Sequence, residues 1–91
     1  MKQHLEYISK GVSGYIVYKD NENQFRLYYE FGSGKCVMII YLPQDWERET
    51  NTSLLDKAKI LDFVCKQVII DKAPNSSAEI VDNKWINIIK R

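Results

Sequence analysis

The chain has 91 residues, 45% of them hydrophobic and 27% charged, so it has the composition of a globular protein and not of a disordered segment. Its length suits a single domain over residues 1–91, because natural domains mostly span about 50–250 residues. Thirteen Lys and Arg against twelve Asp and Glu give a net charge of +1, which argues against the strongly basic surface typical of nucleic-acid-binding domains. A domain this small buries only about 60–65% of its unfolded surface, so a partner would add to its stability.

The first half of the chain predicts a three-stranded antiparallel meander. Residues 1–11 alternate weakly and end at Gly11, which indicates either a short helix or a flexible lead-in. Residues 15–18 are rich in β-branched and aromatic side chains, and the polar residues 20–23 suit a turn. Residues 24–31 alternate clearly, with Phe25, Leu27, Tyr29 and Phe31 on one side. After a reversal at residues 32–34, residues 36–42 are apolar on both sides, as in a central strand or one covered on both faces, and Pro43 ends them.

A polar loop and one long helix are expected next. Residues 44–51 are mostly polar and read as a solvated loop anchored by Trp46. Ser53 is a good N-cap, with Asp56 three residues later, so a helix is predicted from about Leu54 to about residue 70. The residues expected to share its buried face are Leu54, Ala58, Leu61, Val64, Cys65 and Val68.

The last segment, residues 78–89, predicts a hairpin around Asp82 and Asn83, with a single strand as the alternative. The element order is then β-β-β-α-β-β, an α+β fold of two layers in which the helix packs on the antiparallel sheet. The order of strands within the sheet is not defined by these patterns.

Few residues have the character of a catalytic or metal site. His4 is the one histidine, in a segment expected to fray, and Cys36 and Cys65 lie in apolar runs as buried reduced thiols. We therefore expect no cofactor, no metal ion and no catalytic residues. The amino terminus lacks the apolar core of a signal peptide, and no stretch approaches the roughly 20 apolar residues of a membrane span, so we expect a cytoplasmic protein of bacterial type without membrane contact.

Two surfaces leave apolar side chains unaccounted for. The first is the sheet face opposite the helix, which carries Arg26, Tyr28, Val37, Ile39 and Tyr41 together with one side of the strand at residues 15–18. The second is a helix stripe formed by Ile60, Phe63 and Ile70, which points away from the predicted buried face. Trp46 is a further candidate as an exposed anchor for a partner.

These surfaces predict a non-enzymatic protein-interaction domain that self-associates or binds another protein. The alternative is a single-stranded RNA-binding module in which Arg26, Tyr28 and Tyr41 stack on bases; the near-zero net charge disfavours nucleic acid relative to protein. A third hypothesis is an enzyme that uses the carboxylates of Asp45, Glu47 and Glu49.

Overall fold

A computed structural model describes residues 2–32 and 35–90 of the chain, and within them six strands form one antiparallel sheet. The order of strands across the sheet is β1-β2-β3-β4-β6-β5. The elements are β1 (His4–Lys10), β2 (Ser13–Lys19), β3 (Gln24–Gly32), β4 (Lys35–Ile39), α1 (Pro43–Thr50), the 3₁₀ turn η1 (Leu54–Asp56), α2 (Lys57–Lys72), β5 (Ser76–Val81) and β6 (Trp85–Lys90). The predicted α+β class is confirmed.

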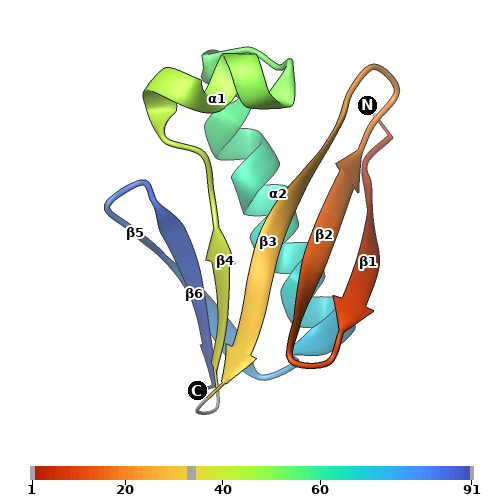
Figure 1. The fold of residues 1–91 in the computed structure, drawn as a ribbon, viewed down its shortest axis with the longest axis vertical. Coiled ribbons are helices and arrows are strands. Elements are labelled where there is room, and N and C mark those ends of the chain that lie inside the picture. The colour runs from red at the N-terminus through yellow and green to blue at the C-terminus, as the bar shows by residue number, and fades with distance from the viewer. Residues whose placement is uncertain (1, 33–34, 91) are drawn as a thin grey trace.

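The long helix α2 covers one face of the sheet. In Figure 1 it lies behind the strands, while the short helix α1 sits at one end of the sheet. The face turned toward the viewer carries no helix from the described part of the chain. We call the side that packs against α2 the core face and the opposite side the outer face.

The sheet has more strands than the predicted three-stranded meander, because residues 4–10 form β1. The expectation of a short helix or a flexible lead-in was wrong. Leu5 and Tyr7 pack against the core, and the Tyr7 hydroxyl donates to Asp71 of α2 at 2.7 Å. Gly11 has φ of +67° in the two-residue loop to β2, a backbone conformation that glycine adopts without strain. The glycine therefore reverses a hairpin and does not end a helix.

Residues 43–50 form α1 where a solvated loop was predicted. Pro43 stands in the first turn, where its fixed φ favours a helix, and Asn51 ends the helix in the left-handed conformation. Trp46 is fully buried, and its indole Nε1 donates to the Ser53 carbonyl oxygen at 3.2 Å. The segment is therefore a helix whose Trp46 side chain packs in the core, while most of its polar side chains face the solvent.

The predicted long helix is confirmed, with changes at both ends. Ser53 caps the turn η1, where its hydroxyl oxygen accepts a hydrogen bond from the Leu55 amide at 3.1 Å, and the α-helical bonding begins only at Lys57. Leu54 and Ala58 are exposed, contrary to the predicted buried face. The described residues of α2 that are buried are Lys57, Ile60, Leu61, Val64, Cys65 and Val68.

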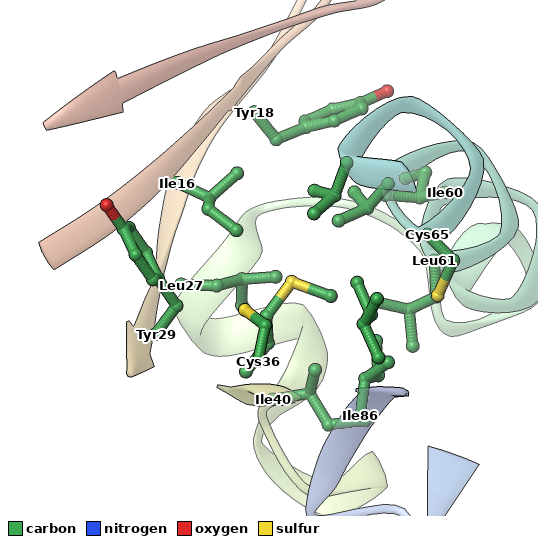
Figure 2. Close-up of a cluster of buried hydrophobic side chains, with 14 of the residues drawn as sticks. Ile16, Tyr18, Leu27, Tyr29, Cys36, Ile40, Ile60, Leu61, Cys65 and Ile86 are labelled. Atoms are coloured by element: carbon green, nitrogen blue, oxygen red, sulfur yellow. The ribbon is translucent and has the colours of Figure 1, made fainter. Parts of the chain in front are cut away.

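The core fills the space between α2 and the core face of the sheet. Figure 2 shows side chains of the strands, among them Ile16, Leu27 and Ile86, meeting Ile60 and Leu61 of α2. The alternation predicted for residues 24–31 places Phe25, Leu27 and Tyr29 in this core. Phe31, at the end of the strand, is partly exposed.

The carboxyl-terminal hairpin is confirmed. Asp82 and Asn83 both have positive φ, of 52° and 56°, a conformation that Asn and Asp tolerate better than most residues. Strand β6 pairs with β4, so β4 lies in the interior of the sheet, as predicted for a strand that is apolar on both sides. The reversal predicted at residues 32–34 includes positions 33 and 34, which lie outside the described residues.

Coverage of β4 on both faces, the other possibility for this strand, was wrong. Ile39 lies on the outer face with 49% of its surface exposed. A strand in the middle of a sheet needs neighbours on both edges, but it can still present one bare face, and this is the arrangement here.

Candidate functional site

An apolar row crosses the whole outer face, with one residue from each strand. The register pairs Ile8 with Tyr15, Tyr15 with Tyr28, Ile39 with Trp85, and Trp85 with Val81. Tyr28 and Ile39 are adjacent in sequence to the paired residues Tyr29 and Met38. They therefore lie opposite one another on β3 and β4 and connect the row on β1–β3 with the row on β4, β6 and β5. We call these six side chains the outer row; its members in strand order are Ile8, Tyr15, Tyr28, Ile39, Trp85 and Val81.

The outer row exists because side chains alternate between the faces of each strand. The core-face residues Ile16, Leu27 and Met38 are buried against α2, so their sequence neighbours project away from it. Ile8, Tyr28 and Ile39 are large apolar or aromatic residues with 36–49% of their surface exposed. The sheet therefore carries apolar side chains on both faces, although α2 covers only one.

Two further rows of side chains lie on the outer face, one on each side of the outer row, and they contain the charged residues nearest to it. One side, which we call the Glu30 flank, is formed by Lys10, Ser13, Glu30, Val37, Asn87 and Glu79. The other side, which we call the Arg26 flank, is formed by Glu6, Val17, Arg26 and Tyr41. The apolar strip is thus bordered by side chains of both signs, which is the usual anatomy of a protein interface with a polar rim.

Contacts among the aromatic and charged side chains hold this surface in one arrangement. The rings of Tyr15 and Tyr28 meet edge to face with centroids 5.8 Å apart, and the Arg26 guanidinium carbon lies 4.5 Å from the centroid of the Tyr15 ring. The Tyr41 hydroxyl donates to the Arg26 carbonyl oxygen at 3.0 Å. Less side-chain freedom would therefore be lost when this surface binds.

Arg26 and Glu30 are the charged residues nearest to the middle of the outer row. The Glu30 carboxylate accepts a hydrogen bond from the Tyr28 hydroxyl at 2.7 Å, which raises the pKa of Tyr28. Among residues 2–32 and 35–90, neither Arg26 nor Glu30 has an ion-pair partner within 4 Å. The Tyr28 hydroxyl and the Tyr15 ring position the two charged groups, and neither charge is neutralised by an opposite charge in this part of the chain.

The predicted helix stripe does not form a continuous surface. Ile60 is 2% exposed and belongs to the core, while Phe63 is half-buried, with its ring centroid 6.1 Å from that of Tyr18. Ile70 is exposed, but it stands alone at the far end of α2. The predicted stripe was wrong because the buried face of α2 includes Ile60.

Trp46 cannot act as an exposed anchor, because its side chain is fully buried. The second tryptophan, Trp85, is half-buried and lies in the outer row. The signal for it was present in the sequence, since Trp85, Asn87 and Ile89 alternate with the buried Ile86 and Ile88.

The sheet brings the predicted outer-face residues together. Arg26, Tyr28, Val37, Ile39 and Tyr41 all lie on the outer face. Ile8, Tyr15 and Trp85 extend that surface to the neighbouring strands and were not among the named candidates. Ile8 was missed because residues 1–11 were not recognised as a strand.

The carboxylates of residues 45–49 are occupied by local contacts. Arg48 pairs with Asp45 at 2.8 Å and with Glu49 at 3.1 Å, and Glu47 accepts a hydrogen bond from the Leu54 amide at 3.0 Å. The larger cavities of the described residues are lined by other side chains. The three acidic side chains are thus used in contacts within α1 and with the turn η1 that follows it.

The largest of those cavities, of about 610 Å³, lies between the β2–β3 turn and the residues that precede α2. Asp20 in its wall accepts hydrogen bonds from the Tyr18 hydroxyl at 2.7 Å and from the amides of Glu22 and Asn23. Its carboxylate is therefore used to shape the turn. No cluster of three metal-ligating side chains exists within the described residues.

Cys36 and Cys65 are free and buried, as predicted. Burial raises the pKa of each thiol to about 11, because the charged thiolate is poorly solvated in the core. The neutral thiols pack as small apolar groups, and neither has the lowered pKa of an activated nucleophile.

Among the described residues, no helix is long and apolar enough to cross a membrane. No family model matches the sequence, and the searches of curated proteins and of solved structures found no significant match.

Proposed function

We propose that this chain is a non-enzymatic protein-interaction domain that binds its partner through the outer face of the sheet. The observation that supports the proposal is the outer row, a strip of apolar and aromatic side chains that crosses all six strands without a covering element in the described residues.

The size of the outer row is suited to a protein surface. Strands lie about 4.8 Å apart, so six strands make a strip about 24 Å long between its first and last side chains. Contiguous apolar patches of this extent, rimmed by polar residues, mark interaction sites on soluble domains. Tyr, Trp and Arg, the residue types that most often dominate binding energy, all lie in or beside the strip.

The charges around the outer row favour a protein over RNA. The Glu30 carboxylate lies beside Tyr28, where an RNA phosphate would be repelled. The net charge of +1 supplies little attraction to a nucleic-acid backbone. RNA binding by Arg26, Tyr28 and Tyr41 stays a prediction, and the experiment below distinguishes it.

The experiment places a photoreactive benzophenone amino acid at position 39 of the outer row or at position 70 on α2. Both native side chains are exposed isoleucines, so position 70 is a matched control on the opposite layer. We expect irradiation in cells to give discrete cross-linked protein species from position 39 and none from position 70. Equal yields from the two positions, or no protein adduct at position 39, would contradict the proposal.

Digestion of the cross-linked samples with ribonuclease tests the alternative. A protein adduct resists the enzyme, whereas an adduct that ribonuclease removes would favour single-stranded RNA binding. We place the domain in the cytoplasm, where free thiols such as those of Cys36 and Cys65 persist.

A further inference from the structure

We propose that the partner of the outer face is a second copy of this chain, packed face to face about a two-fold axis that runs along the outer row. This inference rests on the proposed function, because it names the occupant of the same surface. It is carried by the pattern of charges on the two flanks and by the area of the sheet.

A two-fold axis along the outer row exchanges the two flanks between the copies. Each strand then faces its own counterpart, and a side chain on the Glu30 flank of one copy lies opposite the Arg26 flank of the other. Arg26 and Glu30 lie on the same strand, two positions before and two positions after Tyr28. The rotation therefore places Arg26 of each copy opposite Glu30 of the second copy, and forms this pair twice.

Two other strands obey the same rule. On β1, Glu6 and Lys10 lie two positions on either side of Ile8 and have opposite charges, although Glu6 already pairs with Lys19 of its own chain at 2.9 Å. On β4 and the residues that follow it, Val37 and Tyr41 flank Ile39 in the same way, and both present apolar surface. On β1, β3 and β4 the two flanks thus meet complementary positions under the rotation, as a surface that binds itself requires, whereas on β2 Ser13 meets Val17.

The pair of Arg26 and Glu30 occupies the favourable position for such a contact. Sheets packed face to face are rotated by about 30° relative to each other, so alignment is best near their centre and worst at their edges. The centre of this sheet lies between β3 and β4. Strand β3 is next to it, whereas Glu6 and Lys10 lie on the edge strand β1.

If the outer face is buried in a dimer, Arg26 needs an opposite charge from the second copy. An interface that covers Arg26 removes water from its guanidinium, and a buried charge without a partner is costly. Within the described part of its own chain Arg26 has no carboxylate within 4 Å. The two-fold arrangement supplies one, and it removes the solvent from a strip of aromatic side chains at the same time.

The area indicates a weak, reversible dimer. Six strands about 4.8 Å apart and five residues at about 3.3 Å each describe a face of about 24 Å by about 16 Å, which is about 400 Å² per copy or about 800 Å² in total. Specific interfaces begin near about 1,000 Å² and stable ones bury about 1,600 Å². We therefore expect a weak association whose extent increases with the concentration of the chain.

The test reverses the two charges separately. The variants Arg26→Glu and Glu30→Arg each place like charges opposite one another in a homodimer. We expect each variant alone to dissociate at least tenfold more readily than the native chain in sedimentation experiments. Mixed in equal amounts, they restore both attractive pairs, so we expect a heterodimer with the native affinity.

The double variant Arg26→Glu/Glu30→Arg regains the dimer in a single chain, and Lys59→Glu on the exposed side of α2 serves as the control that changes charge elsewhere. Circular dichroism establishes that each variant is folded. A native chain that stays monomeric into the millimolar range, or single variants whose mixture does not associate, would overturn the two-fold arrangement.

The outcomes separate this inference from the proposed function. If the purified chain is monomeric but position 39 still cross-links to a different protein in cells, the outer face is a binding surface and its occupant is not a second copy. If position 39 gives no protein adduct in cells and the purified chain does not associate, both proposals fail.

Discussion

Gly14 lies where the side chains of Ser9 and Tyr29 meet over the sheet. These residues are its register partners on β1 and β3, and their hydroxyl groups lie 2.7 Å apart. A Cβ atom at Gly14 would overlap the backbone carbonyl oxygen of Ile8. The absence of a side chain is therefore what allows β1 to approach β2, and through it allows Ile8 to join the outer row.

We expect Gly14→Ala to lower the free energy of unfolding by at least about 2 kcal/mol, since the overlap involves backbone that cannot move aside without breaking strand pairing. Urea denaturation measures this change. Gly32→Ala is the matched control, because a Cβ there meets nothing within 4 Å. Equal losses in the two variants would contradict the close approach at Gly14.

The two cysteines give a second test at the scale of the residue. With a pKa of about 11 in the fold, Cys36 and Cys65 carry little thiolate at pH 8. We expect both to react with iodoacetamide at least about a hundredfold more slowly than in urea, where the pKa returns to about 8.5. Mass spectrometry of the time course measures this ratio. Fast labelling of either thiol in the folded chain would show that it is accessible.

The same raised pKa values determine a dependence of stability on pH. Above about pH 8.5 the unfolded chain loses protons from its thiols while the folded chain keeps them, so unfolding becomes easier as pH rises toward 11. We expect the urea midpoint to fall over this interval, and the variant Cys36→Ala/Cys65→Ala to show a smaller fall. A midpoint that rises with pH would contradict the assignment.

At the scale of the element, the two tryptophans have different tasks. Trp46 fastens α1 to the core, where it meets the Phe25 ring edge to face at 5.4 Å between centroids. Trp85 belongs to the outer row and is half-buried. One indole stabilises the fold, and the other is available for binding.

We expect Trp46→Ala to lower the free energy of unfolding by about 3–5 kcal/mol, as for a large side chain removed from a core. Trp85→Ala serves as its matched comparison. It is expected to cost less than about half of that in stability, but to weaken association. Chemical denaturation and sedimentation measure the two quantities, and a similar loss of stability in both variants would argue that Trp85 is also a core residue.

The elements differ in how well sequence patterns describe them. Strand β3 was predicted because Phe25, Leu27, Tyr29 and Phe31 occupy every second position, and α2 because Ser53 and a run of apolar residues indicate its start. Residues 4–10 were not predicted as a strand, since their alternation includes only a few apolar side chains. Residues 43–50 were not predicted as a helix because most of their side chains are polar, although Pro43 and Asn51 suit its two ends and Trp46 fixes it to the core.

Part of the candidate site could be predicted from the alternation of side chains along single strands. Arg26, Tyr28 and Ile39 lie on strands whose alternation is visible, so their shared face follows from the period of two. The extension to Ile8 and Trp85 depends on strand order, which is a long-range property that local patterns do not contain. The prediction of the helix stripe was wrong because Ile60 belongs to the buried face of α2, and Phe63 also packs against the core.

At the scale of the whole molecule, the sheet is wider than its helical layer. A six-stranded sheet with one long helix leaves one face bare, and a chain of 91 residues has no further described element to cover it. We propose that this face is buried by association, which adds most to the stability of a small domain. The two-fold arrangement does so with the charges of Arg26 and Glu30 paired across the interface.

The measurement that tests this account most directly is the concentration dependence of the mass in solution for the native chain, Ile39→Lys and Ile70→Lys. We expect the native chain and Ile70→Lys to approach twice the chain mass of 10.7 kDa as concentration rises. Ile39→Lys, which places a charge in the outer row, is expected to remain at 10.7 kDa while folded. A native chain that never exceeds the monomer mass, or a dimer that survives Ile39→Lys and is lost in Ile70→Lys, would contradict the outer face as the interface.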